Sequence, residues 1–324
     1  MIAVDHAWML AAALLLDAVV GDPDTVWRRV PHPVAVIGGL IGWLDRALNR
    51  DRAPPARRRL LGVLALAVTV VLAVAVGVAL ERLFRAFPGG TIGMVVVAAI
   101  LLGGRSLYDH VAAVADGLDQ SVAAGRAAVS RIVGRDPGSL DGPRVARAAI
   151  ESAAENFSDG VVAPAIWFLV LGLPGLFAYK AINTADSMIG HLTPRHVDFG
   201  RAAARLDDLA NLPASRFAGA LMALAAPLAG GSVAASFRVM RQEAPRHRSP
   251  NAGWPEAAMA AALGIALAGP RRYGGIIVDD PFLNRAGRRD ADAAYIRRAL
   301  RVYAGACAIL WLVVAVLAAA VLAW

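Results

Sequence analysis

Two uncharged stretches constrain the fold of this chain more than any other feature. Leu60–Leu80 runs for 21 residues without a charge, and Val302–Trp324 runs for 23. A helix of about 20 apolar residues is long enough to cross the hydrocarbon core of a bilayer. Because the backbone polar groups inside a bilayer must be satisfied within the segment, each stretch is expected to form a membrane-spanning helix. The chain is therefore predicted to be a polytopic membrane protein.

The composition agrees with this prediction, since 58% of the residues are hydrophobic and only 18% are charged. Soluble domains carry about 25% charged residues. Further apolar stretches are shorter or interrupted by Pro or Gly: Ala7–Leu16, Val34–Leu44, Thr91–Gly104, Val161–Tyr179, Phe217–Ala235 and Ala257–Gly269. Broken apolar segments are tolerated where they pack against protein. We expect an all-α, polytopic integral membrane helical bundle in which some apolar segments are broken or re-entrant.

The charged residues indicate orientation rather than a nucleic-acid partner. The net charge is +8, but the arginines are spread over several loops. Two basic loops, Arg46–Arg59 and Arg285–Arg301, are expected to face the cytoplasm by the positive-inside rule. Polar helices are predicted on that side within residues 105–160 and 195–215, the second stopped by Pro213. We expect one membrane-embedded catalytic domain covering residues 1–324.

The first polar cluster is acidic. Glu151, Glu155 and Asp159 are spaced i, i+4, i+8, which places them within an arc of about 80° on a helix, beside Asn156. Stacked carboxylates repel one another unless a cation lies among them, and Mg²⁺ commonly bridges one or two carboxylates to phosphates. The alternative is a solvated helix face. The apolar segment that follows favours a functional role.

The second cluster contains Lys180, the only lysine in a chain with 32 arginines. A lone lysine suggests that a compact ammonium group is needed at this position. The alternative is that codon bias favours arginine throughout the chain and that this single lysine remains by chance. Its predicted helix face also carries amide, hydroxyl and imidazole groups, with one carboxylate to the side: Asn183, Thr184, Ser187, His191 and Asp186. This set suits a polyphosphate or a carboxylate under activation. The alternative is a hydrogen-bonded seam between membrane helices.

A third cluster, Arg201, Arg205, Asp207, Asp208 and Asn211, could complete a metal site or form a solvated helix. Asp22, His32 and Asn251 lie in turn-rich segments that carry little chemical signal alone. The chain contains no GxxxxGK[ST] or GxGxxG phosphate-binding motif. A bound nucleotide would therefore be held by carboxylates, a metal ion and arginines.

At these residues the chain resembles the adenosylcobinamide-phosphate synthases of cobalamin biosynthesis, the CobD/CbiB family. The matching stretches occur in family order: Asp17–Pro23 (DAVVGDP), Pro31–Gly38 (PHPVAVIG), Val129–Asp136 (VSRIVGRD), Ala148–Pro164 (AAIESAAENFSDGVVAP), Tyr179–His191 (YKAINTADSMIGH), Phe199–Arg216 (FGRAAARLDDLANLPASR) and Ser249–Gly264 (SPNAGWPEAAMAAALG). The match covers residue 17 to about residue 280, and it is loose over Arg271–Arg301 and the last span.

The resemblance implies an ATP-dependent ligase in the inner membrane, with its active site facing the cytoplasm. Such enzymes join aminopropanol phosphate to the last free propionate of adenosylcobyric acid, with Mg²⁺ and ATP, and an acyl-phosphate is the expected intermediate. The resemblance also implies contact with later membrane enzymes of cobalamin assembly.

The implied roles are assigned residue by residue. Lys180, Asp186 and His191 are expected to be catalytic. Metal binding is expected at Glu151, Glu155, Asp159, Asp207 and Asp208. Substrate or nucleotide binding is expected at Asp22, His32, Asn156, Asn183, Ser187, Arg205 and Asn251.

Two alternatives belong to other classes. A membrane prenyl or phosphoryl transferase also uses Mg²⁺ on helical carboxylates, but the repeated NDxxDxxxD-like motif expected of it is not found. A non-catalytic membrane sensor or transporter, like signalling relatives of the family, would not need Lys180 together with three carboxylate clusters.

Overall fold

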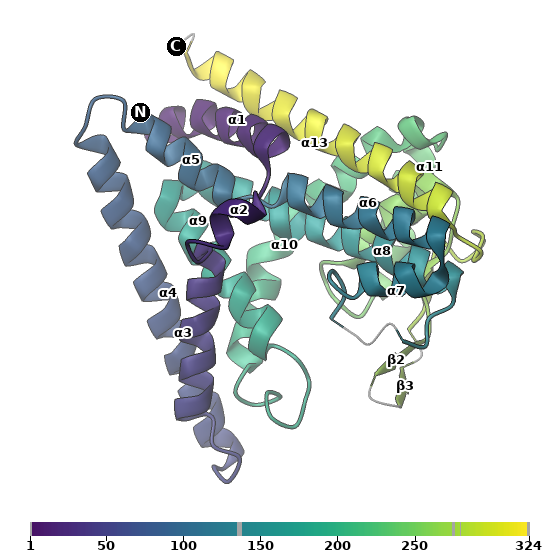
Figure 1. Cartoon of the computed structure of the whole chain (residues 1–324), viewed down its shortest axis with the longest axis horizontal. Helices are drawn as coiled ribbons and strands as arrows, with labels where there is room; N and C mark the ends of the chain where they lie inside the picture. Colours follow the sequence, from purple (N-terminus) through teal and green to yellow (C-terminus); the bar gives the residue numbers. More distant parts are fainter. Residues whose placement is uncertain (1, 135–137, 274–275, 279, 323–324) are drawn as a thin grey trace. The chain divides into compact units, whose positions relative to one another are not determined.

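The computed structural model describes residues 2–134, 138–273, 276–278 and 280–322, and these are mostly helical (Figure 1). The end of the Val129–Asp136 stretch lies outside the described residues. The elements are α1 (Ile2–Val20), α2 (Asp24–Trp27), α3 (Pro33–Leu48), α4 (Pro55–Arg85), α5 (Thr91–Leu101), α6 (Gly104–Gln120), α7 (Val122–Val129), α8 (Gly142–Phe157), η1 (Ser158–Val162), α9 (Ala163–Ile189), α10 (Arg201–Ala225), η2 (Ala226–Ala229), α11 (Val233–Glu243), η3 (Ala244–Arg246), α12 (Gly253–Leu263), β1 (Leu267–Ala268), β2 (Arg271–Tyr273), β3 (Ile276–Val278), β4 (Phe282–Leu283) and α13 (Ala293–Leu322).

The helices confirm the all-α polytopic architecture. In the described part of the chain, 5 helical stretches are long and apolar enough to cross a membrane: Pro55–Arg85, Thr91–Gln120, Gly142–Ile189, Arg201–Ala229 and Ala293–Ala320. Leu60–Leu80 lies in the first of them, and residues 302–320 of the second uncharged stretch lie in the last. The described strands are short and form two antiparallel pairs, β1 with β4 and β2 with β3.

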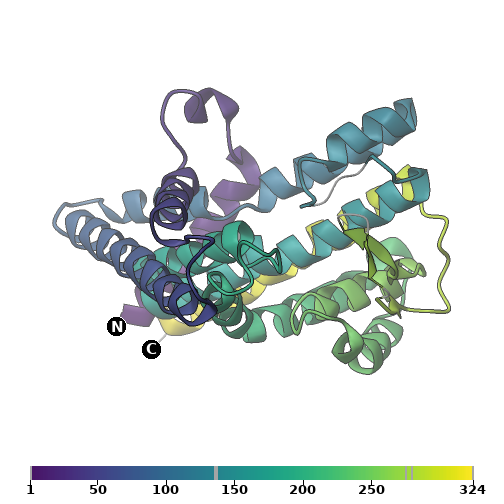
Figure 2. The ribbon, with the colours of Figure 1, turned by 90° about the horizontal axis from the view of Figure 1, so that it is seen from below.

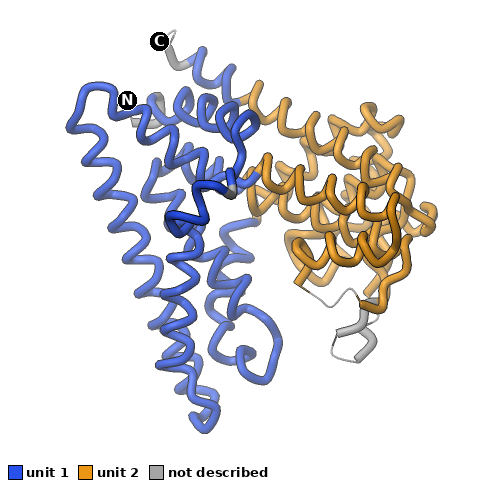
Figure 3. The backbone as a smooth tube through the Cα atoms, in the orientation of Figure 1, with its two compact units in different colours: residues 1–103, 163–211, 314–324 blue, residues 104–162, 212–313 orange. Residues whose placement is uncertain are grey.

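The chain divides into two compact units (Figure 3). Unit 1 comprises residues 1–103, 163–211 and 314–324, and unit 2 comprises residues 104–162 and 212–313. The two units are defined by which parts of the chain pack together. Whether residues 1–324 act as one catalytic domain stays a prediction.

Unit 1 is built around α4, which lies beside α9 (Figures 1 and 2). Two glycines of α4 allow close backbone approach. A Cβ atom at Gly77 would lie 2.7 Å from Cα of Pro174, and one at Gly62 would overlap the carbonyl of Phe199. The apolar core next to these contacts consists of Ile41, Leu44, Ala65, Leu66, Ala185, Ile189, Phe199 and Ala203. This core holds the helices that carry the polar residues of the candidate site.

Helix α9 is broken at Gly172, where φ is 64° and ψ is −150°. The N–H group of Leu173, freed by the break, donates to Oε2 of Glu81 at 3.2 Å. On the other side of the break, Nδ1 of the buried His6 lies 3.3 Å from the carbonyl oxygen of Leu169 and so must donate to it. Two side chains from distant helices therefore satisfy backbone groups at the break, as an apolar environment requires.

We expect Gly172→Ala to destabilise unit 1 by about 2–4 kcal/mol, because this backbone conformation is nearly restricted to glycine. An added Cβ atom would also lie 2.5 Å from Oε2 of Glu81. Thermal unfolding in detergent measures the effect, with Gly39→Ala as the control, since a Cβ atom there meets nothing within 4 Å. A melting temperature equal to that of the control would contradict the assigned strain.

The loop between α9 and α10 is anchored to α3 and α4. Arg195 donates to Oδ2 of Asp45 at 2.7 Å, and Asn49 donates to Oδ1 of Asp45 at 2.8 Å and to the carbonyl of Arg195 at 2.9 Å. The Arg58 guanidinium donates to Asn49 at 2.9 Å and to the carbonyl of Arg195. These bonds fix where the chain turns after the helix that carries Lys180.

This anchor predicts a pH dependence of stability. Burial raises the pKa of Asp45, but the hydrogen bonds from Asn49 and Arg195 outweigh it and hold that pKa below 3.8. A depressed folded-state pKa stabilises the fold above the unfolded value of about 3.9, and this is lost as pH falls through the folded pKa. The melting temperature of Asp45→Asn should therefore lie below that of the wild type at pH 6, and the gap should narrow below about pH 4. A gap that stays constant across this range would contradict the assignment.

Unit 2 contains the predicted polar helices of residues 105–160, which form α6, α7 and α8 (Figure 1). Ser121 separates the first two and caps α7 by accepting from the N–H group of Ala124 at 3.0 Å. Asp141 caps α8 by accepting from the N–H group of Arg144 at 3.0 Å. Both caps satisfy N–H groups that the first turn of a helix leaves open.

The prediction that Pro213 stops the polar helix of residues 195–215 is wrong. Helix α10 begins at Arg201 and continues through Pro213 to Ala225. Side chains satisfy carbonyl groups around the proline: Trp167 donates to Ala210 at 3.3 Å, and Arg216 donates to Leu212 at 2.9 Å. Such contacts allow proline inside a helix in an apolar environment.

Candidate functional site

A buried polar network in unit 1 joins α9 to α10. The carboxylate of Asp207, only 7% exposed, accepts from Asn183 at 3.3 Å and from Asn211 at 2.9 Å. The amide oxygen of Asn211 in turn accepts from the hydroxyl of Tyr179 at 2.9 Å. Two members of the network, Asp207 and Asn211, belong to α10, which lies in a stretch long and apolar enough to span a membrane. Buried networks with satisfied partners fix their members in one arrangement.

Lys180 belongs to the same part of unit 1, one residue after Tyr179 and three before Asn183. Its side chain is buried, and Thr184, one turn later, donates to the Lys180 carbonyl at 2.6 Å. The charges of Asp186 and Asp208 lie near enough to act on Asp207. The structure thus brings together four predicted site residues, Asn183, Asp186, Asp207 and Asp208, on the helices that also carry the buried Lys180.

One predicted catalytic residue does not share the helix face of Lys180. Helix α9 ends at Ile189, so His191 lies outside the helix and is exposed. Gly190 follows the helix, and a Cβ atom there would overlap the carboxylate of Asp186. Ser187 stays on α9 but is exposed. The prediction that His191 lies on the same helix face is therefore wrong, while its catalytic role stays a prediction.

Asp22 and His32 form a separate cluster in unit 1. Nδ1 of His32 accepts from the N–H group of Val34 at 3.2 Å, which caps α3. Its Nε2 atom therefore carries the proton and faces the carbonyl of Ile100 at 3.2 Å, with Asp22 at 3.8 Å. The ring also packs edge-on against Trp27, with centroids 4.5 Å apart. These contacts give His32 a structural role, and substrate binding by either residue stays a prediction.

The acidic residues of α8 lie in unit 2 and differ in exposure. Glu151 is buried and accepts from the backbone N–H of Ala268 at 2.9 Å, which supports a residue with a positive φ of 57°. Glu155 is exposed, and Asp159 is half-buried. Asn156 donates to the carbonyl of Ser152 at 2.9 Å.

Asp159 lies in a π-helical turn, η1 (Ser158–Val162), so α-helical spacing alone does not determine where it points, and the i, i+4, i+8 face stays a prediction. A π turn carries more residues per turn than an α-helix. Such turns are frequent at functional sites. The metal-binding roles of Glu151, Glu155 and Asp159 stay predictions.

Two further predicted binding residues differ from each other. Arg205 is exposed on α10 in unit 1. Asn251, in unit 2, is buried and accepts from Ser215 at 3.0 Å and from Arg216 at 3.2 Å. Arg216 also lies over the ring of Trp254, 4.7 Å from its centroid. Asn251 thus helps to hold the loop before α12.

The described residues do not form a metal cage. Among them, no group of three or more His, Cys, Asp or Glu side chains is placed to hold a metal ion. The carboxylates of Asp207 and Asp208 fit a different way of binding Mg²⁺, in which the ion arrives with the phosphates of a nucleotide and needs only one or two protein carboxylates.

Sequence reasoning missed three residues that the structure places at polar positions of unit 1. Tyr179 was counted with the apolar run, although its hydroxyl reaches Asn211. His6 and Glu81 lie at the break in α9 with their Nε2 and Oε1 atoms 3.8 Å apart. The sequence feature that could have identified Glu81 is its position directly after the uncharged run Leu60–Leu80.

The chain is similar to a defined family over most of its length. Residues 10–303 match the family model described as CobD/Cbib protein. It is 53% identical over 306 residues to "Cobalamin biosynthesis protein CobD" of Rhizobium meliloti (strain 1021), covering 93% of this chain and 94% of that protein.

Other relatives extend this similarity. The proteins of the same name from Brucella suis biovar 1 (strain 1330) and Rhodobacter capsulatus are 52% and 46% identical. The matches cover 91% of both chains for the first, and 97% of this chain and 98% of the relative for the second. No solved structure matches the chain significantly. The extent and identity of these matches show that the chain belongs to the CobD/CbiB family.

Proposed function

We propose that this protein acts in cobalamin biosynthesis as an ATP-dependent ligase that joins aminopropanol phosphate to a propionate of adenosylcobyric acid. The family relationship supports the pathway, since the relatives are named cobalamin biosynthesis proteins. The observation that carries the chemistry is the buried Lys180 of α9, which lies along the helix between Tyr179 and Asn183, two members of the Asp207 network. Ionisable residues inside a membrane bundle are costly and usually functional.

The proposed reaction has two steps. A propionate oxygen attacks the γ-phosphorus of ATP, the bond to the bridging oxygen of ADP breaks, and an acyl-phosphate forms. The amine of aminopropanol phosphate then attacks the acyl carbon, and inorganic phosphate leaves as the amide forms. The first step needs positive charge at the transferred phosphoryl group, which is the role proposed for Lys180. The second needs a base for the amine proton, which we assign to Asp186 or His191.

Asp207 and Asp208 are proposed to face a Mg²⁺ ion that enters with ATP. The positive charge of this ion would neutralise part of the charge of the phosphates. Asn183 and Asn211 orient the Asp207 carboxylate through the hydrogen bonds described above. A carboxylate held by two amide donors does not need to reorganise when substrate binds. This arrangement is the chain's own contribution to the first step.

The proposed orientation follows from the two basic loops of the sequence. ATP is cytoplasmic, and the positive-inside rule places the loops Arg46–Arg59 and Arg285–Arg301 on the cytoplasmic face of the inner membrane. The active site is therefore proposed to face the cytoplasm.

The assay that tests the proposal follows ADP release by purified protein in detergent. We expect release that requires adenosylcobyric acid, aminopropanol phosphate and Mg²⁺ together, and that stops when any one is omitted. A prenyl transferase would instead release pyrophosphate from a prenyl donor, and a sensor or transporter would turn over none of these substrates. ADP release independent of the corrinoid would count against the proposal.

A further inference from the structure

Helix α11 in unit 2 presents one exposed face that neither the fold nor the proposed ligase reaction explains. Its exposed or half-exposed residues, Ala234, Phe237, Arg238, Arg241 and Gln242, are spaced i, i+3, i+4, i+7 and i+8. At 100° per residue they lie within an arc of about 140°. The opposite side carries the buried Ser236 and Met240. The helix is therefore fixed to the protein on one side and open on the other.

The buried side determines how this face is held. Helix α11 packs against α12, and a Cβ atom at Gly219 would lie 2.7 Å from the sulfur of Met240. The helix begins at Val233, shortly after η2 ends a stretch apolar enough to span a membrane. Its first turn is capped by Ser232, whose hydroxyl accepts from Ala235 at 3.4 Å. The exposed face thus belongs to a rigid element, and it lies close in sequence to a membrane-spanning segment.

The charge on this face is not neutralised within the described residues. Arg238 and Arg241 have no salt bridge or side-chain hydrogen bond there, whereas Arg297 pairs with both Asp116 and Asp119. Residues 233–248 contain four arginines and a single acid, Glu243. That acid is turned away, since its Oε2 atom accepts from the backbone N–H of Asn284.

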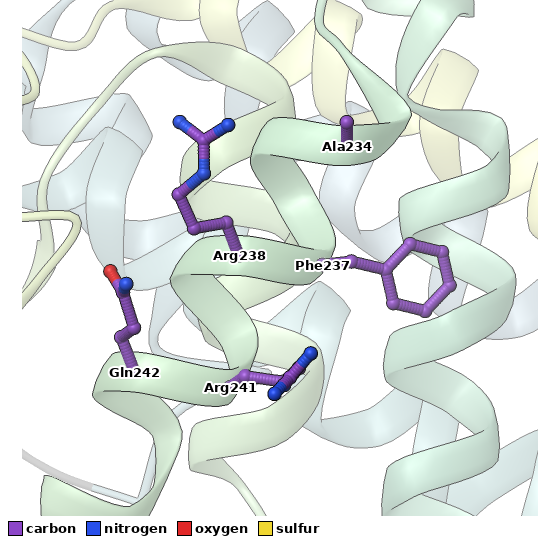
Figure 4. Close-up of a pocket in the computed structure, with 5 residues that line it drawn as sticks. All are labelled: Ala234, Phe237, Arg238, Arg241 and Gln242. Atoms are coloured by element: carbon purple, nitrogen blue, oxygen red, sulfur yellow. The ribbon is translucent and has the colours of Figure 1, made fainter.

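The two arginines line a hollow of about 420 Å³ together with Ala234, Phe237 and Gln242 (Figure 4). The figure shows their side chains extending from successive turns of one helix. Guanidinium groups present a planar set of N–H donors that matches the oxygens of a phosphate, and a glutamine amide adds a further donor. The ring of Phe237 and the methyl group of Ala234 give the hollow an apolar side. The donors carry positive charge without an acid among them, so the complementary ligand is an anion.

We propose that this hollow binds a phosphate group through Arg238, Arg241 and Gln242. The same chemistry is offered by the headgroup of an anionic phospholipid and by a free phosphate compound. A position shortly after a membrane-spanning segment places the arginines where anionic headgroups attract basic side chains. The proposal does not depend on the ligase reaction, whose proposed residues lie on α9 and α10 and in the loop between them.

The test uses the full chain and the double variant Arg238→Gln/Arg241→Gln. One arm measures binding of inorganic phosphate in detergent, from the rise of the melting temperature with phosphate at constant ionic strength. The other arm counts phosphatidylglycerol molecules retained by the protein from nanodiscs, by native mass spectrometry. The matched control is Arg105→Gln/Arg288→Gln, which removes two exposed arginines of unit 2 that pair with Asp109 and Asp290.

The expected result is a loss of about tenfold or more in phosphate affinity, lipid retention or both for the double variant, since charge-assisted hydrogen bonds are lost. The control should stay within about twofold of the wild type. Loss in the phosphate arm alone identifies a free phosphate compound as the ligand, and loss in the lipid arm identifies a headgroup. Binding that is unchanged in both arms, or lost equally in the control, overturns the proposal.

Discussion

Lys180→Arg should lower turnover nearly as much as Lys180→Ala, by about 100-fold or more, which corresponds to about 3 kcal/mol of barrier. Lys180 is only 9% exposed, so its side chain has little free space around it. A guanidinium is wider and planar, and its charge lies farther from Cα than that of an ammonium. If the site is shaped for an ammonium, the guanidinium of the arginine variant would not reach the position next to the phosphoryl group that is proposed for the Lys180 ammonium.

The measurement is turnover per folded protein, with Arg82→Lys as the reverse exchange at an exposed position of α4. That control should retain wild-type activity, since exposed basic side chains are largely interchangeable. If Lys180 only reached towards the headgroups, arginine would do the same equally well. Full activity of Lys180→Arg with an inactive Lys180→Ala would reduce Lys180 to a generic cation, and full activity of both would remove its role.

Asp207→Asn should also lower turnover by about 100-fold or more. The substitution keeps the size of the side chain but removes its charge. It also directs an NH₂ group at Asn183 or Asn211, both of which now donate to Asp207. A donor facing a donor in a buried site costs about 1–3 kcal/mol, so a lower melting temperature is expected as well.

The two effects of Asp207→Asn are separated by measuring turnover and unfolding on the same preparation. Asp109→Asn is the control, because Asp109 is exposed and pairs with Arg105, one helical turn away, at 2.9 Å. It should change neither quantity appreciably. A variant that unfolds earlier yet turns over normally at low temperature would make the Asp207 network a purely structural seam.

Much of the helical framework could be predicted because the responsible physics is local in sequence. The cost of unsatisfied backbone groups in a bilayer makes an uncharged run of 21 residues a helix, and the run Leu60–Leu80 lies inside α4. The start of α8 could be predicted from Asp141, which caps it.

Interrupted apolar segments, Val161–Tyr179 among them, could be predicted from Pro and Gly, but the geometry of each interruption could not, because distant residues take part in it. The sharp break at Gly172 depends on Glu81 from α4 and His6 from α1. Helix α10 continues through Pro213, and near the proline Trp167 donates to the carbonyl of Ala210. A proline alone indicates the end of a helix, and only the folded neighbours show that its lost hydrogen bond is tolerated.

The candidate site was predicted in part for a similar reason. Polar residues at helical spacing in an apolar sequence identified Lys180, Asn183 and Asp207. The same spacing failed for His191, since α9 ends at Ile189, and for Asp159 the spacing is altered by the π turn in which it lies. Tyr179 could not be assigned to the site from the sequence, because an aromatic ring also fits an apolar run. Its polar role depends on the hydrogen bond that its hydroxyl donates to Asn211 in the folded protein.

One isotope measurement tests the central claim most directly. Adenosylcobyric acid labelled with ¹⁸O in its free propionate is incubated with the purified protein, aminopropanol phosphate and Mg-ATP. Activation as an acyl-phosphate transfers one labelled oxygen to inorganic phosphate for each amide formed, with ADP as the other product. Mass spectrometry should therefore find the label in phosphate, in equal amount to the new amide. Label in AMP, or amide formed without label in phosphate, would contradict this account.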